Sequence, residues 1–584
     1  MVVASHDAGL AVAGEYAERS RWLRVDVIVM GAAVLALMIL VVFPILSLLI
    51  ASVWEDGRPT LQHFHDVLTE PLFLRPLYNS LILGLSTAIL SVSVGVPLAW
   101  AVSRTNVPGK GFIKFTATAS YLSPAFLTAI AYVNLFSPNA GLVNTLVRDV
   151  LGMPWATFNI FSMTGLVIVT SLGTFPYVYL LAVSALQSVD ASYEEAAQIL
   201  GAGKFRTALA ITGPLVAPAI LSGALLSFVH AIALFGSQAI IGLPGRVVTL
   251  PTRLYSLFDY PPQYGLASAL SLVFVLITVV ALYLQRSFLA RRSYITLGGK
   301  GARPQLVDLG PMRWVLFAFC VVVFWFAIAM PYATLIAVSF SKSWGLSFWQ
   351  NLTLDHYKFI LFDYAITRRA IVNGLGLAIV AATVTVILGA LLSWIDLRTK
   401  APGRKILDYI ALVPLGLPGI VMAIALIQFW LAMPIALYGT LIILLLAYVG
   451  RYIPLGVRAA NTSLQQIDPS LEESARILGA SWWQTLREVT LPLMRPGLFA
   501  GWVLVFVPVI QELSASILLF SSGSITIAVA IYNLYETGYT EPTAALSLVS
   551  MVIIGLAIWI TAKLGGTKAI GGGQTQTSPG VGAA

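Results

Sequence analysis

Long runs of apolar residues recur along the whole chain, with short polar segments between them. A bilayer core of about 30 Å needs roughly 20 apolar residues in a helix that rises about 1.5 Å per residue. The runs are apolar on every face, as at residues 441–446, and do not alternate as the strands of a membrane barrel do. We therefore predict an all-α membrane protein with twelve transmembrane helices, at residues 27–53, 80–102, 115–137, 162–186, 215–241, 266–288, 314–340, 374–395, 408–433, 438–460, 496–520 and 544–563.

The second half of the sequence repeats the first. Residues 79–110 align without gaps on 373–404 and share Arg-Thr and Pro-Gly pairs, and residues 193–223 match 471–501 at a separation of 278 residues. An even number of spans in each half gives both halves the same orientation in the membrane. We predict an N-terminal segment at 1–26, a first six-helix half at 27–290, a Gly- and Arg-rich linker at 291–313, a second six-helix half at 314–563 and a flexible tail at 564–584.

Composition and charge agree with a chain that lies mostly in lipid, because 58% of its 584 residues are hydrophobic and only 10% are charged. Lys and Arg favour cytoplasmic loops, and most of the 34 such residues fall on one side if the N-terminus is inside. We therefore predict that the N-terminal segment, the linker and the tail are cytoplasmic. The net charge of +9 indicates orientation rather than nucleic-acid binding, since no loop combines a basic run with aromatics. The single cysteine, Cys320, excludes an intrachain disulfide.

A polar motif follows the fourth and the tenth predicted spans. Each copy has a Glu, a small residue and an Ala, then a Gly after three residues and a Pro thirteen residues later. Asp190 and Asp468 mark the start of a short amphipathic helix, with Ser192 and Ser470 as candidate N-caps. The glycine allows a turn at positive φ before a second helix. We call residues 190–214 the first knob and residues 468–492 the second knob.

A knob at the same place in both halves suits a partner with two-fold symmetry. The motif resembles the coupling loop, or EAA motif, of ABC importer permeases, and the resemblance extends over both halves. It implies two tandem permease halves of the type I fold, each docked through its knob on one subunit of a separate ABC ATPase dimer. The alternative is an ordinary amphipathic connecting helix. The resemblance assigns ATPase coupling to Glu194, Glu195, Ala196, Ala197, Gly201, Pro214, Glu472, Glu473, Ser474, Ala475, Gly479 and Pro492, with direct contact expected at 195, 197, 201, 473, 475 and 479.

An ATP-driven machine must bind ATP, yet the one lookalike of a phosphate-binding loop does not fit. It ends in Gly203 and Lys204 but lacks the upstream Gly, and Phe205 stands where Ser or Thr is needed. We expect no nucleotide site, no catalytic residue and no cofactor in this chain, with ATP used by the partner subunit. The resemblance implies a non-enzymatic transport subunit in the bacterial inner membrane, served by a periplasmic or other extracytoplasmic substrate-binding protein.

Polar side chains within spans are costly and usually face a cavity or a partner. Those predicted for the translocation path are His230, Gln238, Gln511 and Glu512. The alternatives are that Glu512 lies near the outer interface or pairs with a neighbouring Arg, and that His230 is a packing residue. The outer-loop histidines lack the spacing of metal ligands, so no metal site is expected.

The fused arrangement, with QELSASILL at 511–519 and YGLASALSL at 264–272, is most similar to ferric-iron transport permeases. Related permeases for phosphonate, thiamine, polyamine or sulfate remain alternatives. A secondary transporter can also consist of two parallel six-helix repeats, but such proteins usually carry several buried ionisable residues, whereas Glu512 stands nearly alone here. A membrane-embedded enzyme would need a cluster of catalytic side chains, and the sequence indicates none.

Overall fold

The computed structural model of the chain describes residues 29–55, 57–153, 155–290, 306–399 and 401–564. The predicted N-terminal segment, most of the predicted linker and all but the first residue of the predicted tail lie outside these ranges. Within them the chain is almost entirely helical, apart from a short antiparallel ribbon of β1 (Trp54–Glu55) and β2 (Arg58–Pro59). The predicted all-α class is confirmed.

The first half begins with a long helix, Val29–Val53, which contains η1 (Met38–Val42) and α2 (Phe43–Val53). The other helices of this half are α3 (Gln62–Thr69), α4 (Pro71–Arg104), α5 (Lys110–Leu122), α6 (Ala125–Phe136), α7 (Leu142–Thr145), η2 (Leu146–Val150), α8 (Met163–Ser188), α9 (Ala191–Ile199), α10 (Lys204–Thr207), η3 (Ala208–Thr212), α11 (Gly213–Ala233), η4 (Gln238–Gly242), α12 (Leu250–Ser256) and α13 (Tyr264–Ala290).

The second half begins with the corresponding long helix, Met312–Phe340, which contains α14 (Met312–Phe324), η5 (Trp325–Ala329) and α15 (Met330–Phe340). It continues with η6 (Phe348–Gln350), α16 (Asp355–Lys358), η7 (Phe359–Asp363), α17 (Ala365–Arg398), α18 (Arg404–Leu412), η8 (Val413–Gly416), α19 (Gly419–Leu431), α20 (Leu441–Gln465), α21 (Pro469–Ile477), α22 (Trp482–Thr485), η9 (Leu486–Thr490), α23 (Leu491–Ile510), α24 (Ser516–Leu519), α25 (Ile527–Glu536) and α26 (Thr540–Leu564).

Ten helices of the described ranges are long and apolar enough to cross a bilayer, and two bent pairs raise the number to twelve if each pair is one span. The pairs correct our expectation of continuous helices at 115–137 and 408–433. α5 and α6 are bent by 97°, and the segment Arg404–Gly416 and α19 by 115°. The residue before a proline avoids helical geometry, and Ser123 and Leu417, which precede Pro124 and Pro418, are extended with ψ of 126° and 116°.

Two further predicted spans, 215–241 and 496–520, also end early. The helices stop at Ala233 and Ile510, and the chain continues through short turns into η4 and α24. Side chains satisfy backbone groups that these breaks release, as non-helical backbone at membrane depth requires. Gln238 donates to the carbonyl of Ala231 at 2.8 Å, and Glu512 accepts from the N–H of Ala515 at 2.9 Å.

The first long helix of each half packs against the other half. Val29–Val53 lies between α13 of its own half and α19 and α20 of the other, and Met312–Phe340 lies between α26 of its own half and α5 and α6 of the other. The Tyr132 hydroxyl donates to the carbonyl of Phe326 at 2.9 Å, and the rings of Phe43 and Phe429 stack with centroids 5.7 Å apart. The two repeats are therefore continuous in sequence but interlocked in space.

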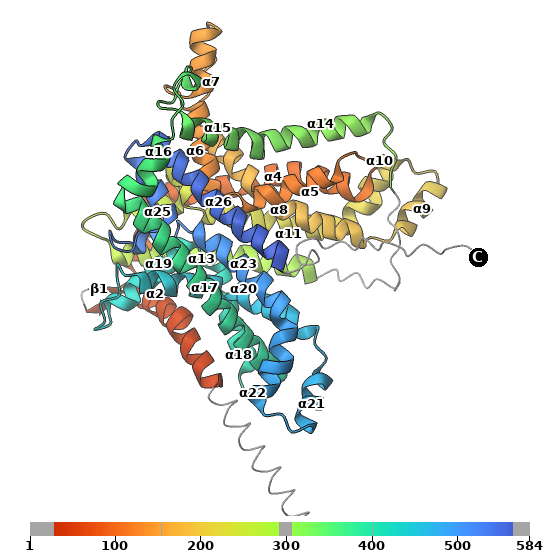
Figure 1. Cartoon of the computed structure of the whole chain (residues 1–584), viewed down its shortest axis with the longest axis vertical. Coiled ribbons are helices and arrows are strands. Elements are labelled where there is room, and N and C mark those ends of the chain that lie inside the picture. The colour runs from red at the N-terminus through yellow and green to blue at the C-terminus, as the bar shows by residue number, and fades with distance from the viewer. Residues whose placement is uncertain (1–28, 56, 154, 291–305, 400, 565–584) are drawn as a thin grey trace, which may run out of the picture.

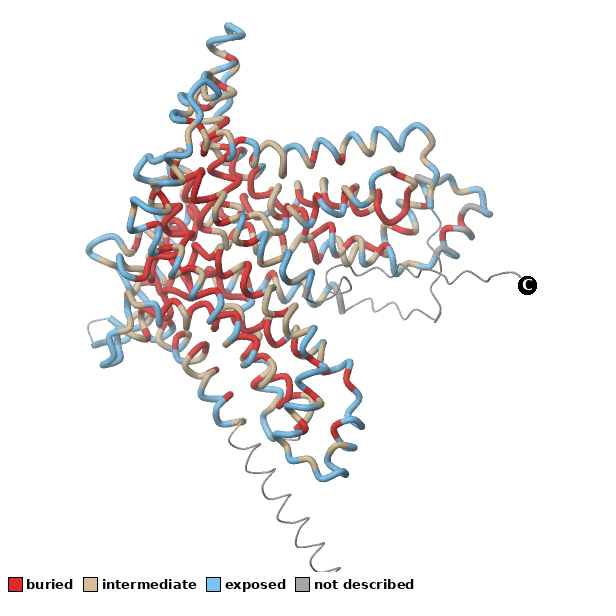
Figure 2. The backbone as a smooth tube through the Cα atoms, in the orientation of Figure 1, coloured by how far each residue is buried: buried red, intermediate tan, exposed pale blue. Residues whose placement is uncertain are grey.

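The two halves form arms that meet at one end and diverge toward the other (Figure 1). α4, α5, α8 and α11 build one arm, with α14 along its outer side, and α17, α18, α20 and α23 build the other, with α2 beside it. Buried backbone is concentrated where the arms meet (Figure 2). α9 and α21, the helices of the two knobs, lie at the free ends of the arms (Figure 1).

Within the second arm, α17 and α20 approach closely through glycines. A Cβ placed on Gly389 would lie 2.4 Å from the carbonyl carbon of Gly456. The corresponding contact of the first arm is looser, because a Cβ on Gly95 would lie 3.0 Å from the backbone of Phe175 and Tyr179. The tight backbone contact makes Gly389 a packing requirement.

We expect Gly389→Ala to lower the free energy of unfolding by about 1–3 kcal/mol, because the two helix backbones must move apart to accept a methyl group. Thermal melting of the purified protein in detergent measures the effect. Gly376→Ala is the matched control, since it lies on the same helix with open space where its Cβ would be. Equal melting shifts for the two variants would contradict the packing role of Gly389.

Candidate functional site

Each knob begins with a helix capped by an aspartate. Asp468 accepts a hydrogen bond from the N–H of Ser470 at 2.9 Å, and Asp190 accepts one from the N–H of Ser192 at the same distance. The caps are therefore the aspartates and not the serines that the sequence suggested. The bonds from these N–H groups hold the pKa of both carboxyls below the usual value of an aspartate. The anion is favoured at the positive end of the helix.

A left-handed glycine ends the first helix of each knob, which confirms the predicted turn. Gly201 has φ of +83° and Gly479 has φ of +84°. The N–H of Ala202 donates to the carbonyl of Ala197 at 2.9 Å, and the N–H of Ala480 donates to that of Ala475 at 3.0 Å. This bond across the glycine is typical of a Schellman motif and fixes where the chain leaves the helix.

An apolar pair lies just before the glycine of each knob and is almost fully exposed. Ile199 and Leu200 are 86% and 87% exposed, and Ile477 and Leu478 are 85% and 87% exposed. These four residues are not among the predicted coupling residues, although they occupy equal positions in the two copies. Paired, exposed apolar side chains at the free end of each arm are suited to a complementary apolar surface of a partner.

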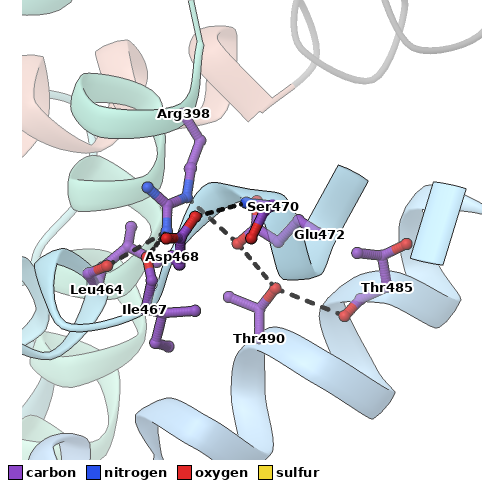
Figure 3. A network of polar contacts seen from close by, with 8 residues as sticks. All are labelled: Arg398, Leu464, Ile467, Asp468, Ser470, Glu472, Thr485 and Thr490. Atoms are coloured by element: carbon purple, nitrogen blue, oxygen red, sulfur yellow. Dashed lines mark hydrogen bonds and ion pairs between the residues drawn. The ribbon is translucent and has the colours of Figure 1, made fainter. Parts of the chain in front are cut away.

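The first glutamate of the second motif copy is buried and fastens the knob to the end of α17. Glu472 accepts from Arg398 Nε at 3.3 Å and from the Thr490 hydroxyl at 3.0 Å (Figure 3). Arg398 Nη2 also donates to the carbonyls of Leu464 and Ile467, at 3.2 and 2.7 Å. The last residue of α17 thereby contacts the end of α20 and the start of the knob, and Glu472 connects it to Thr490 near the end of the knob.

The first knob repeats this arrangement with Glu194 and Arg104. Glu194 Oε2 lies 3.5 Å from Arg104 Nη1, and Glu194 Oε1 accepts from the Thr212 hydroxyl at 2.7 Å. Glu194 and Glu472, which we predicted as coupling residues without direct contact with the partner, lie inside the protein and hold the knob. The arginines missing from our site prediction were recognisable as an identical pair in the two aligned repeats.

The other predicted coupling residues lie on the knobs with different exposure. Ala197 is buried and Ala475 half-buried, so their methyl groups pack beneath the helices. The side chain of Glu195 lies outside the described part of the chain. The exposed residues are Ala196, Gly201, Pro214, Glu473, Ser474, Gly479 and Pro492.

A cavity of about 460 Å³ lies where the halves meet, and residues of both halves line it. His230, Gln511 and Glu512 are among them, as our interpretation of the polar residues expects. Gln238 is not. It is fully buried and hydrogen-bonded to the carbonyl of Ala231 and to the Thr249 hydroxyl, so it stabilises a helix break and does not line this cavity.

An ion pair forms one wall of this cavity. Arg451 Nε lies 3.1 Å from Glu512 Oε2, and the Tyr452 hydroxyl donates to the same oxygen at 2.5 Å. The N–H of Ala515 donates to the other carboxylate oxygen. Glu512 therefore has the arginine partner that we considered for it and also faces the cavity. Arg451 and Tyr452 were missing from the site prediction.

Aromatic and imidazole side chains of the first half also line the cavity. The Tyr177 hydroxyl lies 3.3 Å from His230 Nδ1, and the rings of Tyr121 and Tyr177 are 5.5 Å apart in an edge-on contact. Gln511 of the second half donates to the carbonyl of Leu122 at 2.9 Å. This hydrogen bond joins the break of one half to the break of the other, beside the cavity.

Several known transport proteins are similar in sequence to this chain. A ferric transport system permease protein of Haemophilus influenzae is 28% identical over 510 residues, covering 86% of this chain and 78% of the relative. One of Actinobacillus pleuropneumoniae is 27% identical over 561 residues, covering 93% and 79%. The crystal structure of a bacterial ABC transporter that imports alginate aligns with a TM-score of 0.36 and 21% identity, over 48% of this chain and 97% of that chain.

A family model matches twice, at residues 91–294 and 385–565, once in each half. The two matches together cover more than half of the chain, and each includes one knob and the C-terminal part of the long helix that holds it. The chain belongs to the family of binding-protein-dependent transport system inner membrane components and carries the family's domain twice.

Proposed function

We propose that this chain is the membrane permease subunit of an ATP-driven importer, with both permease halves, and that its two knobs dock on the two subunits of a separate ATPase dimer. The observation that carries the proposal is the equal geometry of the knobs. Each has a capped helix, a left-handed glycine and an exposed apolar tip, and each is fastened by a buried ion pair to a long helix. A movement of the ATPase surface would therefore reach the arm as a whole.

Alternating access is the transport mechanism that this arrangement supports. The arms diverge toward the knobs and are closely packed at the other end (Figures 1 and 2). Closure of the ATPase dimer would bring the knobs together and open the path on the opposite side. ATP hydrolysis in the partner would then return the arms to the arrangement described here.

The proposal fixes the orientation of the chain in a bacterial inner membrane. The knobs face the cytoplasm, and so do both termini, because Lys and Arg gather on that side. A binding protein would deliver the cargo at the end where the arms meet. ATP would be bound by the partner subunit alone, with no catalytic site and no cofactor in this chain.

Ferric iron is the cargo that we propose, because two relatives that match most of the chain are named as ferric transport permeases. Uptake of radioactive ferric iron by proteoliposomes containing the chain, its ATPase and its binding protein tests this choice. Phosphonate, thiamine, polyamine and sulfate are the competing cargoes to be measured beside it. Uptake that continued with the ATPase left out would favour a secondary transporter and contradict the proposal.

We expect the double variant Leu200→Asp/Leu478→Asp to weaken association with the ATPase by about 30-fold, since a charge at a buried contact costs about 2 kcal/mol or more. Cargo uptake should fall with it. Binding of the purified ATPase to permease in lipid nanodiscs measures the affinity. Leu352→Asp is the control, because Leu352 is an exposed leucine away from the knobs. Unchanged ATPase binding by the double variant would refute docking through the knob tips.

A further inference from the structure

The central cavity is asymmetric, although the chain is a repeat. Helices α8 and α20 correspond at a separation of 278 residues, as do α11 and α23. At this separation the first-half counterparts of Arg451, Tyr452 and Glu512 are Gly173, Thr174 and Leu234. The ion pair of the second half therefore has no equivalent in the first half.

The first half has no arginine, tyrosine or glutamate at these positions, and the space that such side chains would fill is part of the cavity. Gly173, Thr174 and Leu234 all line it. A Cβ on Gly173 would meet a single neighbouring atom, the Cβ of Ala125, at 3.7 Å. In the second half the same region is filled, because a Cβ on Gly419 would lie 2.3 Å from Arg451 Nη1. The second half thus lines the cavity with the charged and polar side chains of Arg451, Tyr452 and Glu512, and the first half leaves open space beside Gly173.

The polar groups around this space suit a hard metal ion. The second half contributes the Glu512 carboxylate and the Tyr452 hydroxyl, and the first half contributes the Tyr177 hydroxyl and the His230 imidazole. Carboxylate and phenolate oxygens and imidazole nitrogen are ligands that iron accepts in proteins. His230 and Tyr177 of the first half and Glu512 and Tyr452 of the second half line the same cavity, so both halves border the space in which an ion would lie.

The site is built for passage and not for permanent binding. Among the residues that the structure describes, no three His, Cys, Asp or Glu side chains gather as they would around a resident metal. A transport path needs binding that is weak enough to release the cargo. Arg451 compensates the charge of Glu512 while no cargo is bound, which keeps the carboxylate from being buried without a partner.

We propose that this cavity is a transit site for ferric ion, in which Glu512 and Tyr452 of the second half and Tyr177 and His230 of the first half contact the metal. The site rests on the proposed function, because it takes ferric iron as the cargo. Arg451 is a positioning residue that holds Glu512 toward the cavity in the cargo-free state.

Metal binding can be tested without transport. Ferric citrate is titrated into the purified permease–ATPase complex, and the visible absorption band of an iron–phenolate bond is recorded. We expect this band in the wild-type protein, a weaker band in Tyr452→Phe, and no band in the double variant Tyr177→Phe/Tyr452→Phe. Tyr448→Phe is the matched control, since Tyr448 lies one turn earlier on α20, is buried against Ser516 and does not line the cavity. A band that is equal in the wild type and Tyr452→Phe, or is absent from the wild type, would overturn the assignment.

Transport gives the second measurement. Glu512→Gln should reduce ferric iron uptake by at least about tenfold, the smallest loss usual when a group that supports a metal is removed. Gly173→Leu should block uptake by filling the cavity, whereas Gly376→Leu, at an open position on α17, should not. If wild-type proteoliposomes take up another cargo but no iron, the proposed cargo is wrong. If the wild type, Glu512→Gln and Gly173→Leu all import iron equally, the cargo stands and the transit site is wrong.

Discussion

Replacement of Arg398 by methionine should release the second knob from its arm. The variant leaves the Glu472 carboxylate buried with only the Thr490 hydroxyl as a side-chain partner, and it removes two hydrogen bonds to backbone carbonyls. Loss of one member of a buried ion pair costs about 3–5 kcal/mol. We expect a loss of this size in the free energy of unfolding, together with loss of ATP-driven cargo uptake.

The double variant Arg398→Met/Glu472→Leu separates the two effects. Without either charge, most of the stability should return, because an apolar pair can replace a buried ion pair at little cost. Uptake should stay low, since methionine cannot join the end of α17 to the carbonyls of Leu464 and Ile467, which lie just before the knob. Chemical denaturation in detergent and uptake by proteoliposomes provide the measurements. Arg368→Met, at an exposed arginine on the same helix, is the control. A single variant as stable as this control would refute the role assigned to the pair.

Proline in place of Gly201 and Gly479 should abolish transport. Proline holds φ near −65°, whereas the two glycines have φ of +83° and +84°. The turn after the first knob helix cannot form, so the apolar tip and the second helix lose their relative placement. We expect uptake to fall to background, with the membrane helices still folded.

Alanine variants of the first knob should impair transport less than the proline variants do. Gly201→Ala forces a side chain into left-handed geometry, at a cost of about 1–2 kcal/mol. Gly203→Ala lies two residues away on the same knob, has no positive φ and has open space around it, so it should transport normally. Normal ATP-driven uptake by the double proline variant would show that the knobs do not transmit the movement of the ATPase.

Much of the fold could be predicted because membrane helices are encoded locally. Long apolar runs locate the spans, and the bends before Pro124 and Pro418 could have been anticipated from the effect of a proline on the residue before it. The packing of each first helix against the opposite half could not be predicted. Lipid-exposed helices are apolar on all faces, and nothing in the pattern of residues 29–53 indicates which half they pack against.

The site was predictable to the extent that it repeats. Each half has one knob, one knob glycine and one arginine, Arg104 or Arg398, at equivalent positions. This repetition in the sequence indicates a shared structural role. The burial of a side chain could not be inferred from the sequence, and the structure places Glu194 and Glu472 inside the protein at the base of the knobs. Arg451 occurs once, and its pairing with Glu512 depends on how α20 and the broken end of α23 come together.

The contacts of each first helix with the opposite half constrain how such a chain can be divided or assembled. Were the polypeptide divided between α13 and α14, each product would keep an apolar helix that packs in part against the other product. Neither fragment could complete its interior alone, so the pieces would have to be made together in one membrane. The same interlocking ties the arms during transport, because the two helices restrain the halves from separating while their free ends swing.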